Sequence, residues 1–453
     1  MKHLKLFYSL IIIVYVTGSM NLHAQSQSEK YIERTYSISA LGSITLSSAY
    51  SEIEIFTWDQ NSVKVTGELI YDGRYDEDVR KLLNAFKNSL DAKSSDNSLS
   101  LNLQLIKSSS STWLSRRTTI LINEDKISIS PEKIKTKYKL WMPKLSVNFI
   151  LSNVHLQMGN YGDRGSFEMR YSTATVGDGG SSVFNLNNTD LRIGTIGKAT
   201  INARYSKVNI KEALDVQVDS NNDSFVFGSL NNIEIKARYS KIDIKKALDV
   251  HIDSNNDSFV FGSLNDISAI AKYSTFLFEN NGNNSKFDLN NTTVSGKDFK
   301  TMQISAKYSK FNLGNIAEVT VLSSHSSSFD FSSVNTIVCR DSKYDKFRLA
   351  RVSASAEFDG YNSEVNIVNT APSFHSFSGN FRYGSFHLKL DPSISVALNY
   401  QSTYGNIDFA SGRFRQITKS EKKGSTTIFE GSTDTNAKCN IRITVHDTKG
   451  NIK

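Results

Sequence analysis

The sequence predicts an all-β protein that is mainly a parallel β-helix, or β-solenoid, preceded by a small N-terminal α+β lead-in. Two adjacent stretches of equal length, Ala203–Lys236 and Ala237–Ile270, are near copies of each other. A fixed repeat with strand-like alternation is typical of stacked arrays, in which each unit buries its apolar face against its neighbours. Six tyrosines follow the repeat at nearly constant intervals: Tyr171, Tyr205, Tyr239, Tyr273, Tyr308 and Tyr344.

A half-period divides this repeat, because Val208–Ile210, Phe225–Phe227, Ile242–Ile244 and Phe259–Phe261 recur at one constant spacing. We therefore expect coils of about 17 residues, each with two short strands and two corners, and each paired with the coil before it. Copies that run in the same sense favour parallel stacking. A β-propeller, the main alternative beside an all-β sandwich, needs four antiparallel strands in each repeat.

Alternation along the strands predicts which side chains face inward. From Ile233 through Ile235 and Ala237, a period of two places Tyr239 inward. The six tyrosines are therefore predicted to form a structural ladder at an internal corner, packed against asparagines of the alternate coils. The alternative is an exposed aromatic track that stacks on sugar rings.

Residues 1–24 have the pattern of a secretory signal peptide. Lys2 and Lys5 precede an apolar run at 10–16, and small residues follow near Ala24. The apolar run is too short for a permanent membrane-spanning helix, and no comparable run follows it. We therefore expect an exported protein that is periplasmic, outer-membrane-associated or secreted.

Residues 25–137 are expected to form the lead-in, and residues 138–453 the solenoid. The lead-in contains one amphipathic helix, at about residues 76–92, with acidic residues in its first turn. Its apolar stripe consists of Val79, Leu82, Leu83, Phe86 and Leu90. We expect the lead-in to cover the open edge of the first coil.

Charge and cysteine content limit the partners. The chain has 53 Lys and Arg against 45 Asp and Glu, a formal net charge of +8. An exported basic chain without a nucleic-acid motif favours an acidic polysaccharide or an envelope protein as its partner, not nucleic acid. Cys339 and Cys439 could pair or remain buried thiols. The oligomeric state is not predicted.

A basic residue precedes each tyrosine, and its phase points outward. Two explanations of this basic stripe stay open: a track for an acidic glycan, or a solvated face carried along by duplication of the repeat. The stripe consists of Arg204, Arg238, Lys272, Lys307 and Lys343.

No catalytic, metal or cofactor site is predicted, and the protein is not expected to be an enzyme. The segments 219–223 and 253–257 carry two aspartates each, as calcium loops do, but lack the glycine spacing of an EF-hand. Asp and Asn also suit tight corners. The eight histidines show no HxH or HExxH spacing.

Three phrases resemble a bacterial adhesin family, the auto-transporter-adhesin or head-domain-like β-solenoid proteins common in Bacteroidetes. They are SAYSEIEIF at Ser48–Phe56, YKLWMPKL at Tyr138–Leu145 and VHLQMGNY at Val154–Tyr161. The resemblance extends from Tyr31 to the C-terminus. It implies a β-solenoid with an adhesive role, and it carries no catalytic residues.

The expected function is that of an exported, non-enzymatic cell-envelope adhesin or scaffold that binds extended glycans or envelope proteins. One alternative is a polysaccharide-active β-helix enzyme, which would show carboxylates converging on a groove. Another is a periplasmic protein-binding partner in envelope sensing, which would show a binding patch confined to the lead-in.

Overall fold

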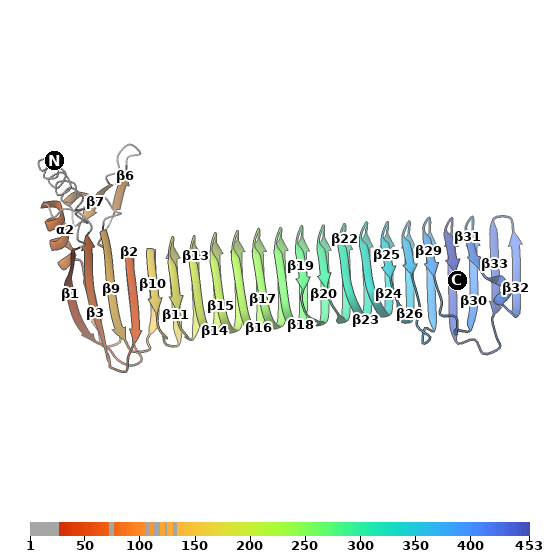
Figure 1. Cartoon of the computed structure of the whole chain (residues 1–453), viewed down its shortest axis with the longest axis horizontal. Coiled ribbons are helices and arrows are strands. Elements are labelled where there is room, and N and C mark those ends of the chain that lie inside the picture. Colours follow the sequence, from red (N-terminus) through yellow and green to blue (C-terminus); the bar gives the residue numbers. More distant parts are fainter. Residues whose placement is uncertain (1–26, 72–76, 106–107, 112–117, 123–124, 130–133) are drawn as a thin grey trace, which may run out of the picture. The chain divides into compact units, whose positions relative to one another are not determined.

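The computed structural model describes residues 27–71, 77–105, 108–111, 118–122, 125–129 and 134–453 (Figure 1). The predicted signal peptide, residues 1–24, lies outside them. The chain divides into two compact units, residues 1–177 and 178–453, and each is described by itself. Strands dominate, and the predicted all-β parallel solenoid is confirmed. Within the described ranges, no helix is long and apolar enough to cross a membrane.

In the first unit, parallel pairing centres on β2 (Ser43–Thr57). On one side β2 pairs with β10 (Ser146–Met158), followed by β11 (Arg164–Arg170) and β12 (Thr173–Val176). On its other side β2 pairs with β5 (Ser98–Asn102) and β9 (Ile134–Met142). Parallel coils therefore already include residues of the predicted lead-in.

Antiparallel strands and a helix complete the described part of this unit. β3 (Ser62–Tyr71) pairs with β9, and β1 (Gln27–Ser37) pairs with β3. The helix is present as α2 (Glu77–Lys87), with Val79, Leu82, Leu83 and Phe86 buried. It ends earlier than predicted because β4 (Asp91–Ser95) forms a hairpin with β5. A separate antiparallel sheet contains β6 (Ser108–Ser111), β7 (Thr118–Ile122) and β8 (Asp125–Ile129).

The second unit contains the regular coils. In β15 (Lys207–Asn221), β16 (Ser224–Arg238) and β17 (Lys241–Asn255), Val208 lies opposite Phe225, which lies opposite Ile242. Each coil of the solenoid is here called a rung. Each rung is offset from the next by one half-period of the sequence repeat, and the predicted coil length is confirmed. Each long strand carries a bend between two straight segments. A sharp corner separates it from the next strand.

The other strands of this stack, in chain order, are as follows. They are β13 (Ser181–Asn187), β14 (Asp190–Arg204), β18 (Ser258–Lys272), β19 (Thr275–Phe278), β20 (Gly282–Asn290), β21 (Thr293–Gly296), β22 (Phe299–Lys307), β23 (Lys310–His325), β24 (Ser328–Lys343), β25 (Lys346–Leu349), β26 (Val352–Tyr361), β27 (Glu364–Ile367), β28 (Ser376–Arg382) and β29 (Ser385–Leu388).

The core between the two straight segments contains columns of phenylalanine rings. Phe259 and Phe276 stack with their centroids 5.0 Å apart, and Phe261 and Phe278 do the same one column over. All four side chains are at most 2% exposed. Identical positions in successive rungs bring the rings together, so each rung is stabilised mainly by its neighbours.

The C-terminal rungs do not follow the chain order, and here the predicted continuous coil is wrong. The chain passes from β29 to β30 (Val396–Thr403) and β31 (Asn406–Phe409), then through the hairpin of β32 (Gln416–Lys423) and β33 (Thr426–Ser432). It returns as β34 (Cys439–His446) and β35 (Lys449–Ile452). These pair in parallel with β28 and β29 on one side and with β30 and β31 on the other. Figure 1 accordingly places the C-terminus between neighbouring rungs, while β33 pairs antiparallel with β30 and covers its other edge.

The two cysteines lie on β24 and β34. Cys339 and Cys439 are both free and buried. Burial raises the pKa of Cys439 to about 12 and raises that of Cys339 further. The structure therefore favours two buried thiols over the disulfide.

Candidate functional site

The tyrosines of the repeat sit at the sharp corner of every second rung. Each has a left-handed backbone, with φ of 55° at Tyr205, 56° at Tyr239 and 53° at Tyr273. On the alternate rungs the corner residue is Asn222 or Asn256, with φ of 62° and 64°. Asparagine tolerates this conformation better than most residues with a side chain, whereas tyrosine adopts it only where surrounding contacts hold the corner in place.

These tyrosine side chains point outward, so the prediction of an internal tyrosine ladder is wrong. Their exposed fractions lie between 49% and 62% for Tyr171, Tyr205, Tyr239, Tyr273, Tyr308 and Tyr344. The reason is the left-handed corner, which interrupts the alternation of side chains. Arg238 and Tyr239 both face solvent, and the next residue, Ser240, is buried instead.

Buried hydroxyl and carboxyl groups hold the corner together. Ser240 Oγ donates to Arg238 O at 2.9 Å and accepts the backbone N–H of Asp223, on the neighbouring rung, at 3.2 Å. The Ser240 N–H in turn donates to Asp257 Oδ1 at 2.7 Å. This buried corner ladder links successive rungs and fixes the backbone that presents the tyrosines.

Only the second aspartate of each predicted corner loop belongs to this ladder, whereas Asp219 and Asp253 are exposed. Asp223 accepts the N–H groups of Ser206 at 2.6 Å and Asn221 at 2.7 Å, and its side chain is buried. Asp257 has the equivalent bonds. Within the described ranges, no group of three or more His, Cys, Asp or Glu could hold a metal ion. The corner carboxylates therefore have a structural explanation.

The buried aspartates predict a particular pH dependence of stability. Burial raises the pKa of Asp223, Asp257 and Asp345 above the ordinary value of 3.8, against the opposing effect of their hydrogen bonds. In the pH window just above 3.8 the folded chain binds more protons than the unfolded chain. Their contribution to stability is thus present at low pH and is lost as pH rises through the folded-state pKa.

A triple Asp→Thr variant at these positions tests that dependence. Threonine already occupies the equivalent corner at Thr292, where its Oγ1 accepts the Ser274 N–H at 3.4 Å. Urea unfolding measured between about pH 4 and about pH 7 should show a smaller loss of unfolding free energy with rising pH in the variant than in the wild type. Parallel curves for the two proteins would contradict the argument.

The basic stripe lies beside the tyrosines and is exposed at all five positions, Arg204, Arg238, Lys272, Lys307 and Lys343. These residues directly precede the corner residue. On the alternate rungs between Arg204 and Lys307, the residue before the corner is Asn221, Asn255 or Asn290. Among the described residues, the only ion pair that a stripe residue makes joins Lys343 to Asp341 at 3.3 Å. The other four cations are available to a ligand.

The sharp corners of successive rungs form a line along the stack, here called the corner edge. Aromatic contacts appear along its later part. Tyr308 contacts His325, and His325 contacts Tyr344, both with centroids 5.5 Å apart. The sequence carried a signal for this, since tyrosines continue at Tyr361, Tyr383 and Tyr404. Their contact depends on which rungs are neighbours, and the sequence repeat does not reveal the order of the last rungs.

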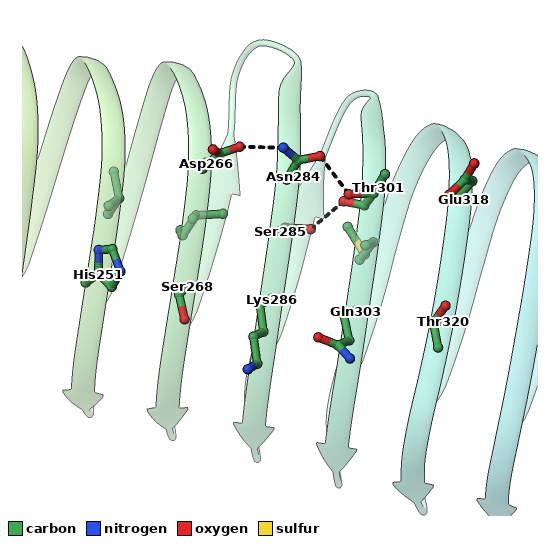
Figure 2. Close-up of a pocket in the computed structure, with 13 residues that line it drawn as sticks. His251, Asp266, Ser268, Asn284, Ser285, Lys286, Thr301, Gln303, Glu318 and Thr320 are labelled. Atoms are coloured by element: carbon green, nitrogen blue, oxygen red, sulfur yellow. Dashed lines mark hydrogen bonds between the residues drawn. The ribbon is translucent and has the colours of Figure 1, made fainter.

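A shallow depression of about 370 Å³ lies on the sheet face made by β17, β18, β20, β22 and β23. Figure 2 shows a polar row across it, in which Asn284 Nδ2 donates to Asp266 Oδ1 at 2.7 Å and Thr301 Oγ1 donates to Asn284 Oδ1 at 2.8 Å. The lining combines short side chains such as Ser268 and Ser285 with longer ones such as Lys286 and Gln303.

The two carboxylates of this depression do not converge. Asp266 and Glu318 are three rungs apart in the strand register, or about 14 Å. Catalytic carboxylate pairs of glycosidases are about 5 to 10 Å apart. The polar row in the depression is therefore explained as a ladder of side chains that hydrogen-bond across parallel strands.

No family model and no curated protein matches the chain. A solved structure described as a putative cell adhesion protein from Clostridium sporogenes aligns with 95% of this chain and 99% of its own, with 10% sequence identity and a TM-score of 0.14. A TM-score this small supports no conclusion about fold or function. The adhesin-family resemblance therefore stays a prediction, and the β-solenoid assignment rests on the strand pairing.

Proposed function

We propose that this protein is an exported, non-enzymatic adhesin or scaffold of the cell envelope that binds an extended acidic polysaccharide along its corner edge. The observation that carries the proposal is the repetition of one exposed pair. A tyrosine and the cation before it recur on every second rung from Arg204 to Tyr344. Two rungs correspond to about 9.6 Å, so the pairs form a line of similar sites.

A line of similar sites suits a polymer better than a small molecule. Each exposed cation contributes little alone, because surface ion pairs are worth about 0 to 1 kcal/mol. A polymer that engages several sites gains affinity from the high effective concentration of the later contacts. The corner hydrogen bonds hold the backbone that carries these side chains, so binding orders the side chains but no backbone segment.

The positive charge along the corner edge favours an acidic ligand. Lys207, Lys241, Lys310 and Lys346 lie two residues beyond the corner tyrosines and add to the stripe. The ring faces of tyrosine pack against the apolar C–H faces of sugars, while the cations attract carboxylate or sulfate groups. Export is proposed on the basis of the predicted signal peptide. The proposal also includes that the protein has no catalytic activity.

Binding of the mature chain to polygalacturonate and hyaluronate, with neutral dextran as reference, tests this function. We expect binding to the two acidic polymers that weakens with added salt. Replacing all five stripe residues with glutamine should lower the affinity at least about tenfold. A matched control replaces five exposed lysines away from the corner with glutamine, which changes the net charge equally: Lys211, Lys246, Lys286, Lys300 and Lys389.

Two outcomes would contradict the proposal. One is no binding to either acidic polymer, or an equal loss in the stripe variant and the control. The other is accumulation of unsaturated products or new reducing ends in proportion to protein, which would support the polysaccharide-active enzyme instead.

A further inference from the structure

The later part of the corner edge carries a continuous row of seven exposed or half-buried rings, here called the aromatic ridge. Successive centroids are 5.5 to 5.8 Å apart and successive ring planes are inclined by 54° to 86°. The ridge consists, in spatial order, of Tyr308, His325, Tyr344, Tyr361, Tyr383, His446 and Tyr404.

The rings of the ridge alternate between two positions, the corner residue and the residue before it, and each position forms a column along the stack. Tyr344 and Tyr383 are corner residues with left-handed backbones, φ 58° at each. Tyr361 and His446 are pre-corner residues, followed by Asn362 and by an aspartate at the corner. The rings therefore zigzag across the edge, one ring to each rung. The inserted strand β34 supplies His446, which contacts both Tyr383 and Tyr404 at 5.7 Å.

The corner does not require aromatic residues at the pre-corner positions. Three earlier alternate rungs form the same corner with Asn221, Asn255 and Asn290 there. In those rungs Tyr205 and Tyr239 are separated by asparagines, and neither contacts another ring within the described part of the chain. Repeat duplication alone would have continued the asparagines, so the change to aromatic residues needs another explanation.

Mutual packing of the rings is an incomplete explanation. Edge-to-face pairs contribute about 0.5 to 1.5 kcal/mol each, which stabilises the edge. The five tyrosines of the ridge nevertheless remain between 39% and 69% exposed. A contiguous exposed aromatic surface on a folded chain is typical of a binding site.

The charges beside the ridge indicate an anionic ligand. The positions between the rings hold Lys307, Lys343 and Arg382, all exposed. The one carboxylate in these two columns is Asp447, at the corner beside His446. A ligand that covers the ridge therefore meets an aromatic ring on every rung and a cation on alternate rungs.

We propose that the aromatic ridge is the stacking platform for the sugar rings of an anionic polysaccharide, an inference that rests on the proposed function. Rungs are about 4.8 Å apart, close to the advance per monosaccharide in an extended glycan chain. One sugar ring can thus lie at each ring of the ridge. Because neighbouring ring planes are inclined by 54° to 86°, the sugars pack on aromatic faces and aromatic edges in alternation. Their carboxylates or sulfates then lie within reach of the interleaved cations.

The ring geometry favours sugars over bases. Single-stranded nucleic acid also binds to aromatic residues within a positive surface. Rings that touch their neighbours edge to face leave no gap into which a base could insert, whereas a chain of sugars can lie across them. An anionic membrane is disfavoured because polar corner residues, among them Ser326, Asn362 and Asp447, interrupt the apolar surface.

Two triple variants of the mature full chain separate the ridge from the rest of the edge. The ridge variant carries Tyr344→Asn, Tyr361→Asn and Tyr383→Asn. The comparison variant carries Tyr205→Asn, Tyr239→Asn and Tyr273→Asn, which removes three tyrosines of the same edge that lie outside the ridge. Asparagine is the residue that the chain itself uses in both columns, so each variant should keep its circular dichroism spectrum. The ridge variant should unfold at a lower temperature because it loses four ring-to-ring contacts, so binding is measured well below the thermal midpoint of either variant.

The affinities for polygalacturonate and hyaluronate give the readout. The ridge variant should bind at least about tenfold more weakly than the wild type, and clearly more weakly than the comparison variant, which loses three rings of the edge but leaves the continuous ridge intact. A Tyr361→Phe variant, which keeps the ring, should bind as the wild type does. Binding should also perturb tyrosine absorbance in the wild type.

The possible failures are distinguishable. If the wild type binds no acidic polymer, the proposed function is wrong. If it binds and the stripe variant binds weakly, but the two tyrosine variants behave alike, the ridge inference alone is overturned. Tighter ridge-dependent binding to oligo-dT or to phosphatidylglycerol vesicles would replace the polysaccharide with that ligand.

Discussion

Deletion of Cys439–Lys453 is expected to disrupt the C-terminal rungs and to make the chain self-associate. These residues form β34 and β35, which fill the space between β28–β29 and β30–β31. Without them, both neighbours keep an unpaired parallel edge inside the stack. Unpaired strand edges recruit strands from other molecules.

The size of this effect follows from burial. The deleted segment contains five apolar side chains that are 0% to 6% exposed: Cys439, Ile441, Ile443, Val445 and Ile452. At about 1.5 to 3 kcal/mol each, their burial contributes on the order of 10 kcal/mol, which is comparable with the whole stability of a typical domain. Gly450 makes the pairing of β35 with β29 specific for this strand, because a residue with a Cβ at that position would overlap the ring of Phe386.

Light scattering and thermal unfolding would measure the outcome. The truncated chain should form oligomers and unfold at a lower temperature than the full chain. A synthetic peptide of the deleted sequence, added in excess, should reduce both effects, and a peptide of shuffled sequence should not. A monomeric truncated chain with an unchanged midpoint would show that the inserted rung is dispensable.

The coil itself could be predicted from the sequence because repetition and alternation are local properties. The offset from Val208 to Phe225 is visible in the sequence as the half-period, and it is the register of β15 with β16. The amphipathic helix was predictable for the same reason, since its buried stripe has helical spacing.

The orientation of the corner tyrosines could not be predicted by alternation. One left-handed residue shifts the phase, so that Tyr239 faces out and Ser240 faces in. A weak signal was present, because a serine or an aspartate follows every repeat tyrosine and such residues suit a buried corner with unpaired N–H groups. Nothing local marks tyrosine as left-handed, since that backbone is held by hydrogen bonds from the neighbouring rung.

The order of the last rungs was beyond sequence analysis because it depends on pairing between distant strands. Arg382 lies opposite His446 in the structure, although β30 and a hairpin separate the two residues along the chain. The aromatic ridge depends on this pairing. The outward phase of the basic stripe, in contrast, followed from alternation and holds in the structure.

Replacing Phe261 with alanine is expected to lower the free energy of unfolding by about 3 to 5 kcal/mol. Its ring is 0% exposed and stacks on Phe278, with centroids 5.0 Å apart and planes inclined by 16°. The rungs on either side are held by their own hydrogen-bonded backbones and can collapse only partly into the cavity. The lost volume is therefore not recovered.

The stacked design determines how this loss would appear. Because each rung contacts mainly its neighbours, a local defect uncouples the rungs on either side, and a single cooperative transition can split into two. Urea unfolding followed by circular dichroism would show either a lower midpoint or a second transition. Val260→Ala, on the same strand with an outward side chain, is the matched control and should change the unfolding free energy by less than about 1 kcal/mol. Equal effects of the two substitutions would mean that the phenylalanine columns are not the main source of stability between rungs.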